Sequence, residues 1–173
     1  MRDPTYDRRI MNQKFFASAL IRESLRSGSI ASLVIMPLGP FFGFLGLRIG
    51  HYGPKLGALL FGSVPEPWFK VLLIFQHFVV GWLSTAPLLL FLVFASYRAS
   101  PVLFGVLYGI GYYVVVNSLA LPFAFGDPTP WQIGLDTIYP SLIGHIFFGV
   151  AIAVAAKRFV AAHCATPPAA TTA

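Results

Sequence analysis

The sequence is poor in charge and in cysteine, and it lacks the common signatures of catalysis. Only 10% of its 173 residues are charged, whereas soluble proteins average about 25%. The single cysteine, Cys164, excludes an intramolecular disulfide and a cysteine cluster for a metal. We find no Gly-x-Ser-x-Gly elbow, phosphate-binding loop or His-x-x-x-His pair. Enzymatic activity therefore has little support from the sequence, and the question of an enzyme stays open.

The sequence has instead four apolar stretches, each about 20 residues long. They cover residues 29–47, 71–95, 102–123 and 138–156. An α-helix rises about 1.5 Å per residue and the hydrocarbon core of a bilayer is about 30 Å thick, so each stretch can cross a membrane. A soluble domain of this size would need polar helix faces to cover four such helices. The sequence therefore predicts an all-α fold, a four-helix transmembrane bundle.

Basic residues are distributed unevenly around these stretches. Nine lie before the first stretch, in the second loop or after the last stretch: Arg2, Arg8, Arg9, Lys14, Arg22, Arg26, Arg98, Lys157 and Arg158. Three lie in the first loop: Arg48, Lys55 and Lys70. The positive-inside rule then places both termini in the cytoplasm. The same rule explains the net charge of +6, so no nucleic-acid partner is predicted.

Both ends of the chain are predicted to lie outside the transmembrane domain, which spans residues 29–158. Residues 1–28 form a cytoplasmic tail, in which residues 10–26 combine apolar and basic positions in a pattern typical of an N-terminal interfacial helix. A cytoplasmic extension of the first spanning helix is the alternative. Residues 159–173 end in an Ala/Thr/Pro-rich segment and are predicted to form a disordered cytoplasmic tail.

Two loop segments resemble each other and indicate an internal repeat. Residues 61–68 read FGSVPEPW, and residues 125–131 read FGDPTPW. Each is followed by a His-x-x-x-Gly pattern, from His77 to Gly81 and from His145 to Gly149, although the Trp-to-His spacing is nine residues in one copy and fourteen in the other. The repeat predicts two duplicated helical hairpins, the second with a longer lead-in before its helix. The alternative is that interfacial loops simply favour these residues.

Three polar residues are predicted to lie at one depth in the membrane. Counting from the ends of the predicted helices places His77, Asn117 and His145 about 7–10 Å below the outer interface. Polar groups at membrane depth are costly, so they are candidates for function. They also serve structural roles, because histidine hydrogen bonds to a neighbouring amide, carbonyl or water stabilise helix packing.

The two histidines permit a more specific hypothesis. If they face each other across the bundle, His77 and His145 suit the axial positions of a b-type haem or a bound metal. Gly81 and Gly149, one turn further in, would leave space for a flat macrocycle. Hydrogen bonds around such a cofactor would come from Gln76, Ser118 and Ser141. A polar layer that handles protons or a solute is the third possibility.

The C-terminal half resembles the YagU-like family of small bacterial inner-membrane proteins. The matching motifs lie within residues 108–158, with Gln76-His77 upstream: Gly109-Ile110-Gly111-Tyr112, Asn117, Leu121-Pro122-Phe123, Gly126-Asp127-Pro128-Thr129-Pro130, Gly144-His145-Ile146-Phe147-Phe148-Gly149 and Lys157-Arg158. The first half departs from the family, because the Pro-Pro-Arg-like element expected after the first helix is absent. The resemblance implies a multi-pass protein of the bacterial inner membrane and adds little about chemistry.

The sequence as a whole favours a membrane protein without enzymatic activity, an accessory or structural subunit of a membrane complex. Pairs of glycines with GxxxG spacing, which let helix backbones approach closely, are candidate docking faces for other membrane subunits or for a second copy of the chain. These pairs are Gly39/Gly43, Gly46/Gly50 and Gly105/Gly109. The alternatives are a haem- or metal-binding electron carrier that uses His77 and His145, and a small transporter or proton-handling protein.

Overall fold

The computed structural model describes residues 4–47, 52–95 and 100–164, and these residues form helices and no strand. Four segments are long and apolar enough to cross a membrane: Lys14–Phe44, Glu66–Phe94, Pro101–Phe125 and Leu135–Ala155. The predicted all-α architecture with four spanning segments is confirmed. The outward faces are strongly apolar, and Phe44 and Phe123 are 89% and 92% exposed. Such faces match a lipid environment.

The first span consists of α1 (Pro4–Ile35) and the short α2 (Leu38–Phe44). Residues 10–26 therefore form no separate interfacial helix: they are continuous with the spanning segment, which was the alternative interpretation. Nothing interrupts α1 because no proline follows Pro4 until Pro37, where the missing backbone N–H ends the helix. Residue Gly50 of the predicted Gly46/Gly50 pair lies outside the described residues.

The second span is α4 (Glu66–Phe94), which continues through Pro87. It is preceded by α3 (Tyr52–Phe61), a short helix in the first loop. A methyl group on Gly57 of α3 would lie 2.7 Å from the Leu73 side chain of α4, so the two helices are in close contact there. The structure therefore packs this part of the first loop on α4.

The third span changes its helix type half-way. It begins as α5 (Pro101–Tyr112), continues as the π-helix η1 (Tyr113–Ala120) and ends as α6 (Leu121–Phe125). At the end of η1 the Leu121 N–H donates to the Val116 carbonyl, five residues earlier. Short π-helical segments occur often at functional sites, and the sequence had predicted an ordinary α-helix here.

The fourth span is α8 (Leu135–Ala155), preceded by the four-residue α7 (Pro130–Ile133) and followed by α9 (Lys157–His163). The predicted disordered tail therefore starts too early at residue 159. Phe159 and Val160 are buried, because α9 packs its apolar side against α4 and α8. Residues 165–173 of that tail lie outside the described residues.

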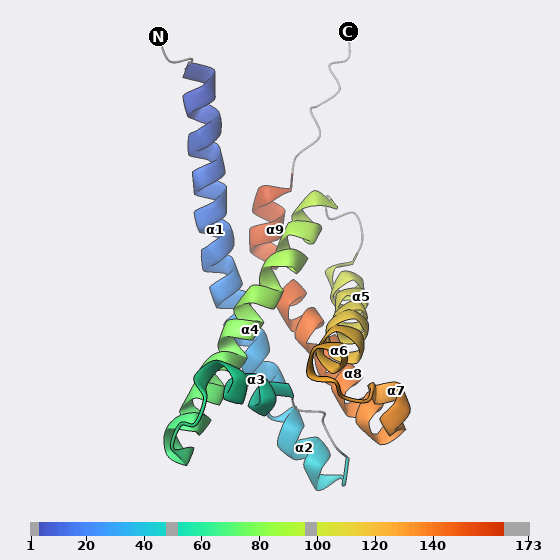
Figure 1. The fold of residues 1–173 in the computed structure, drawn as a ribbon. Helices are drawn as coiled ribbons and strands as arrows, with labels where there is room; N and C mark the ends of the chain where they lie inside the picture. Colours follow the sequence, from blue (N-terminus) through green and yellow to red (C-terminus); the bar gives the residue numbers. More distant parts are fainter. Residues whose placement is uncertain (1–3, 48–51, 96–99, 165–173) are drawn as a thin grey trace.

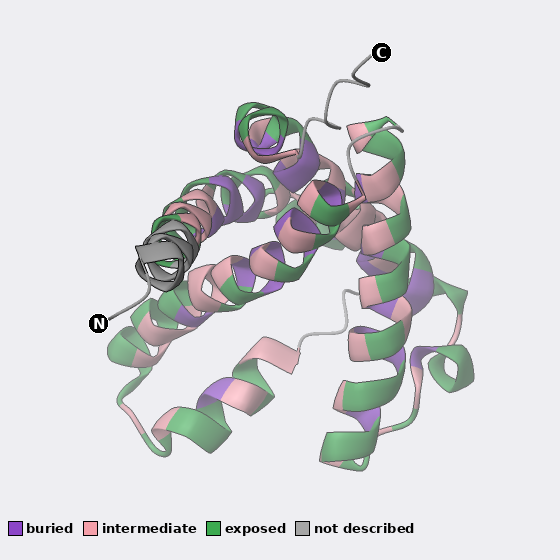
Figure 2. Cartoon of the chain, turned by 90° about the horizontal axis from the view of Figure 1, so that it is seen from above, coloured by how far each residue is buried: buried purple, intermediate pink, exposed green. Residues whose placement is uncertain are grey.

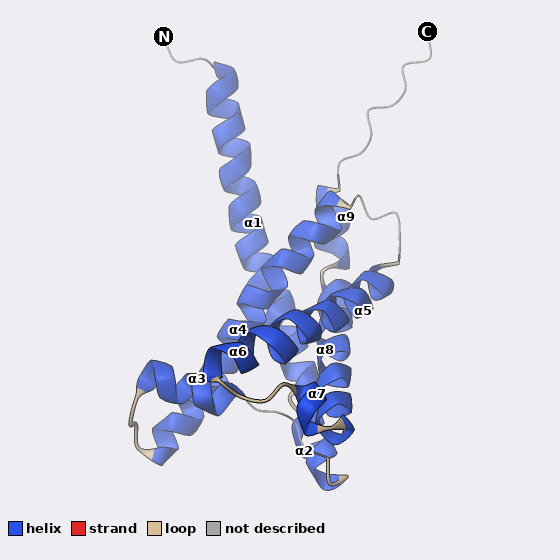
Figure 3. Cartoon of the chain, turned by 45° about the vertical axis from the view of Figure 1, so that its right-hand side comes forward, coloured by secondary structure: helices blue, strands red, loops and turns tan. Residues whose placement is uncertain are grey.

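The spanning helices pack mainly as two pairs, α1 with α4 and α5 with α8, and α1 also packs on α8 (Figure 1). The helix α9 and the beginning of α1 lie toward one end of the molecule, called here the α9 end, and α2, α3 and α7 lie toward the opposite α7 end (Figures 1 and 3). Seen from above, exposed positions cover the outward faces of the helices (Figure 2). This arrangement agrees with an even number of membrane crossings.

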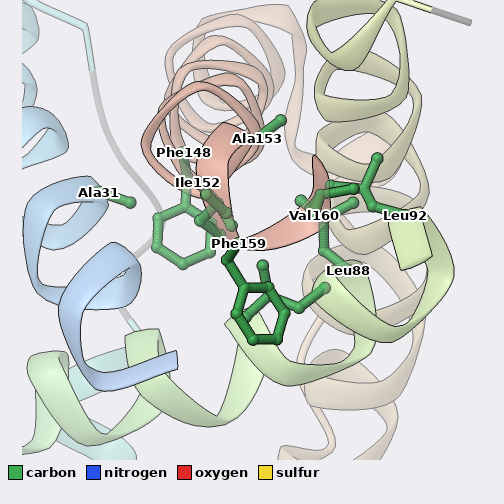
Figure 4. Packing of buried hydrophobic residues seen from close by; sticks show 10 residues of the cluster. Ala31, Leu88, Leu92, Phe148, Ile152, Ala153, Phe159 and Val160 are labelled. Carbon is green, nitrogen blue, oxygen red and sulfur yellow. The ribbon is translucent and has the colours of Figure 1, made fainter. Parts of the chain in front are cut away.

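The packed core occupies the α9 half of the molecule. Its buried side chains come from α1, α4, α8 and α9 (Figure 4): Ala31, Leu88, Leu89, Leu92, Phe148, Ile152, Ala153, Ala156, Phe159 and Val160. Arg26 of α1 adds a polar link, since its guanidinium donates to the Ala155 carbonyl at the end of α8 over 2.6 Å. The α7 half is packed less completely, and the candidate site lies there.

The two repeat segments share their local backbone. Phe61 and Phe125 each end a helix, and the following glycines, Gly62 and Gly126, have φ values of 66° and 64°. Only glycine adopts this left-handed conformation at little cost. The helix α7 explains the unequal Trp-to-His spacing, because it forms the longer lead-in predicted for the second copy. The two repeat segments are therefore similar in structure as well as in sequence.

Candidate functional site

A cavity of about 750 Å³ lies between the two helix pairs in the α7 half. Its wall is formed by parts of α1, α2, α3, α4, α5, η1, α6 and α8. Most of the wall is apolar, and a group of polar side chains is embedded in it: Gln76, His77, Tyr112, Asn117, Ser141 and His145. This size and composition are typical of a small-molecule site, which is mostly apolar with a few convergent polar groups.

The cavity wall carries no formal charge. Among residues 4–47, 52–95 and 100–164, no Asp, Glu, Lys or Arg lines it. A charged ligand would therefore find no counter-ion at a depth where an unpaired charge is costly. This property limits which molecules the cavity can hold.

His145 is fixed in the wall by its own helix and by an aromatic neighbour. Its Nδ1 lies 2.6 Å from the Ser141 carbonyl, one turn earlier in α8. The imidazole stacks on the ring of Tyr112, with centroids 5.4 Å apart and planes 27° apart. Because a carbonyl oxygen only accepts, Nδ1 is the donor, and Nε2 remains available to a ligand.

His77 connects the first helix pair. Its Nε2 lies 3.3 Å from the Ser32 carbonyl of α1 and donates to it. Asn117 of η1 makes the corresponding link in the second pair, since its Nδ2 donates to the Ser141 hydroxyl over 3.0 Å. Each of these polar residues therefore holds two helices together and lines the cavity at the same time.

Gln76 holds α3 against α4. Its Nε2 donates to the Gly53 carbonyl over 3.1 Å, and its Oε1 is buried without a hydrogen-bond partner in the described part of the chain. Ser118, the other predicted hydrogen-bonding residue of η1, is fully buried and lies outside the cavity wall. Its hydroxyl also has no partner among the described residues.

The helix α3 covers the α7 end of the cavity. Four of its residues contribute to the wall: Tyr52, Gly53, Pro54 and Leu56. Two contacts tie α3 to the second helix pair: an ion pair between Lys55 and Asp127, and a stack of Tyr52 on Phe125 with centroids 5.8 Å apart. Burial, and then the charge of Asp127, raise the pKa of the Tyr52 hydroxyl, which keeps it neutral.

Comparison with protein-family models, with curated proteins and with solved structures gave no match. Function is therefore inferred from the geometry of the cavity.

Six of the eight site residues predicted from the sequence line one cavity: Gln76, His77, Gly81, Asn117, Ser141 and His145. Ser118 and Gly149 do not. The sequence reasoning missed Tyr112, Ser84 and Ser32, which also line the wall. Residues five apart share a face of a π-helix and not of an α-helix, so the presence of both Tyr112 and Asn117 in one cavity wall could not be read from the sequence.

Gly81 and Gly149 do not leave space for a macrocycle, and that prediction is wrong. A methyl group on Gly81 would lie 2.2 Å from the Ser32 hydroxyl of α1. One on Gly149 would lie 2.2 Å from the Gly105 carbonyl of α5. At both glycines a neighbouring helix occupies the space that a side chain would take, so these glycines allow close contact between helices instead.

The hypothesis of a haem or metal between His77 and His145 meets one constraint. His77 Nε2, a common ligating atom, donates to the Ser32 carbonyl. Within the described ranges, no group of three or more His, Cys, Asp or Glu side chains is placed to hold a metal. A haem with two axial histidines needs no such group, so that hypothesis stays a prediction.

Proposed function

We propose that this chain is a multi-pass membrane protein that binds a small molecule in its intramembrane cavity. The observation that carries the proposal is the uncharged cavity of about 750 Å³, with His77, Asn117 and His145 in its wall. Binding at this depth is the step that a small transporter or lipid carrier requires. The proposal needs no catalytic group, in keeping with the absence of a catalytic motif from the sequence.

We further propose the bacterial inner membrane as the location, with both termini in the cytoplasm. Basic residues support this orientation, because Lys14, Arg22, Lys157 and Arg158 belong to the α9 half of the chain. Lys55 and Lys70 belong to the opposite half, and each is paired with an acid there, Lys55 with Asp127 and Lys70 with Glu66. The positive-inside rule then puts the α9 end in the cytoplasm and the cavity in the outer half of the membrane. The resemblance to the YagU-like family supports the same location and stays a prediction.

A second candidate function, an accessory subunit of a membrane complex, is favoured by the surface of α2. A methyl group added to Gly39 or Gly43 would meet no atom of the described residues within 4 Å, so this GxxxG pair does not pack against another helix there, although Gly39 also lines the cavity. Small residues of this kind allow close approach of another membrane helix. The Gly105/Gly109 pair supports no such docking, because it packs against α8 within the chain.

Gly144 offers a direct test of ligand binding. It lines the cavity, and a methyl group there would meet no atom within 4 Å. Gly144→Leu therefore adds an apolar side chain to the cavity wall from a Cβ position that is open, and it replaces glycine with a residue whose helix propensity is better by about 1 kcal/mol. Gly111→Leu is the matched control, because Gly111 is exposed in α5, has equally open space and does not line the cavity.

The measurement is native mass spectrometry of the full chain extracted gently from its host membrane. We expect a non-covalently bound small molecule on the wild-type chain and on the control variant Gly111→Leu. In Gly144→Leu we expect this molecule to be absent while the thermal stability is unchanged. Equal occupancy, or none, in all three proteins would overturn the proposal. A reduced haem spectrum that disappears in His77→Ala and His145→Ala would replace it with the electron-carrier hypothesis.

A further inference from the structure

Each of the two histidines that line the cavity keeps one ring nitrogen without a hydrogen bond to the described residues. The Nδ1–H group of His145 donates a hydrogen bond to the Ser141 carbonyl, and the Nε2–H group of His77 donates one to the Ser32 carbonyl. In a neutral imidazole the second ring nitrogen is then an acceptor. Two different helices thus contribute the same chemistry, a nitrogen lone pair in a wall without charge.

The amide of Asn117 repeats this pattern. It donates from Nδ2 to the Ser141 hydroxyl, and its carbonyl oxygen accepts no hydrogen bond within the described residues. The carbonyl oxygen of Gln76 does not contribute, because it is buried beside Gly57 of α3, which does not line the cavity. The fixed polar groups of the two histidines and Asn117 therefore offer acceptors rather than donors.

The hydroxyl groups of the wall do not reverse this balance. Tyr112 accepts from Ser84 over 2.9 Å, and a hydroxyl rotates to donate or accept as needed. A ligand that satisfies the fixed groups must itself donate. A cation would also donate, but no carboxylate lines the described wall, and an unpaired charge at membrane depth is costly. An uncharged donor, such as a hydroxyl group, remains.

Apolar residues of the wall lie on both sides of the polar layer. Leu38 of α2, Leu73 and Ile74 of α4, and Leu121 of α6 lie nearer the α7 end of their spans than the polar residues, and Val80 of α4 and Phe148 of α8 lie about one turn nearer the α9 end. A ligand with its hydroxyl group near His77 and His145 would place an apolar part among these side chains. Such a ligand is amphipathic.

We propose that the cavity binds an uncharged lipid whose head carries a hydroxyl group. This inference rests on the proposed function, since it names the chemical class of the molecule bound. His145 Nε2 accepts the ligand hydroxyl, Asn117 and His77 supply further acceptors, and the acyl or prenyl part contacts the apolar wall near α2 and α3.

The test compares two probes that differ in one hydrogen-bond donor. Dioctanoylglycerol has a free hydroxyl, and in its acetylated form that hydroxyl is capped. Native mass spectrometry titrations use the full chain in mild detergent. We expect the wild-type chain to bind the capped probe about tenfold more weakly, the effect of one hydrogen bond. Gly144→Leu should bind neither probe.

His145→Phe identifies the acceptor. It should weaken binding of the free probe about tenfold and leave the capped probe unaffected. His163→Phe is the matched control, because His163 makes the same contact with a carbonyl four residues earlier, Phe159, over 2.8 Å, and lies outside the cavity wall. It should bind both probes like the wild-type chain.

Equal or tighter binding of the capped probe would overturn the hydroxyl assignment. If Gly144→Leu still abolishes that binding, the proposed cavity function stands, and the ligand accepts a hydrogen bond instead of donating one. If neither probe binds but a cellular molecule is retained in a Gly144-dependent manner, the lipid class is wrong and the function again stands. If Gly144→Leu changes nothing in either experiment, both proposals fail together.

Discussion

Gly149 of α8 lies so close to Gly105 of α5 that a methyl group on Gly149 would come within 2.2 Å of the Gly105 carbonyl oxygen. One turn along, a methyl group on Gly109 would lie 2.3 Å from the His145 carbonyl. The atoms in the way belong to the backbone, so they cannot rotate aside. The crossing of α5 and α8 therefore sets the position of the His145 ring.

Gly149→Ala should separate α5 from α8 and destabilise the protein. Overpacking of a well-packed contact costs about 1–3 kcal/mol, and we expect the upper end because backbone atoms must move. Thermal unfolding in detergent measures the effect. Gly144→Ala, in the same helix but facing open space, should be neutral or slightly stabilising. Equal stability of the two variants would contradict the described crossing.

The crossing of α1 and α4 makes a different prediction, because its closest atom is movable. A methyl group on Gly81 would lie 2.2 Å from the Ser32 hydroxyl but 3.5 Å from the Gly28 carbonyl, the next nearest atom. Gly81→Ala should destabilise by about 1–3 kcal/mol. Ser32→Ala removes the obstructing oxygen, which is buried without a partner in the described chain, and should restore most of the loss.

A double-mutant cycle of thermal stabilities checks this compensation. The coupling between Gly81→Ala and Ser32→Ala should be favourable and about as large as the cost of Gly81→Ala alone. Strictly additive effects would show that the two residues are not in contact. Gly149→Ala, whose obstacle is backbone, should gain nothing from Ser32→Ala.

The ion pair between Lys55 and Asp127 should hold α3 over the cavity. Half-exposed pairs contribute about 0–1 kcal/mol, so Lys55→Ala should change thermal stability little and expose the cavity more often. In a Cys164→Ser background, a maleimide should label Ser141→Cys about two- to fivefold faster when Lys55 is Ala. Lys70→Ala, which breaks the pair with Glu66, should leave the labelling rate unchanged.

Cysteine labelling in intact cells tests the orientation of the chain. Ser63 lies in the exposed loop between α3 and α4, and Ala161 is exposed on α9. In a Cys164→Ser background, a membrane-impermeant maleimide should label Ser63→Cys directly and Ala161→Cys only after the cells are opened. The reverse result would invert the proposed topology and move the cavity to the cytoplasmic half.

The spans and the polar layer were predictable because both depend on counting residues. Each apolar stretch has the length of a bilayer, and helical rise alone places His77, Asn117 and His145 at one depth. All three do line one cavity. The Phe-Gly segments were recognisable because a left-handed glycine ends the helix in both copies.

Helix rotation could not be predicted in the same way. The sequence shows that Gly81 and Gly149 lack side chains, and only the packing shows that neighbouring helices occupy the space. The burial of Phe159 and Val160 likewise depends on the packing of α9 against α4 and α8, which no local sequence pattern predicts. The free acceptors of the cavity wall result from individual hydrogen bonds, which cannot be predicted from the composition.

The π-helix η1 gives the third span an extra residue that its hydrophobicity does not reveal. If one residue were deleted within 113–120, the segment would form an ordinary α-helix with its two flanks nearly in their present rotation, because a π-helical turn holds one residue more than an α-helical turn. Phe125 and Asp127 would then keep their partners Tyr52 and Lys55, whereas the same deletion in α5 would turn everything beyond it by about 100° around the helix axis. Among relatives of this chain, a single-residue gap within 113–120 would mark those that have an ordinary α-helix there.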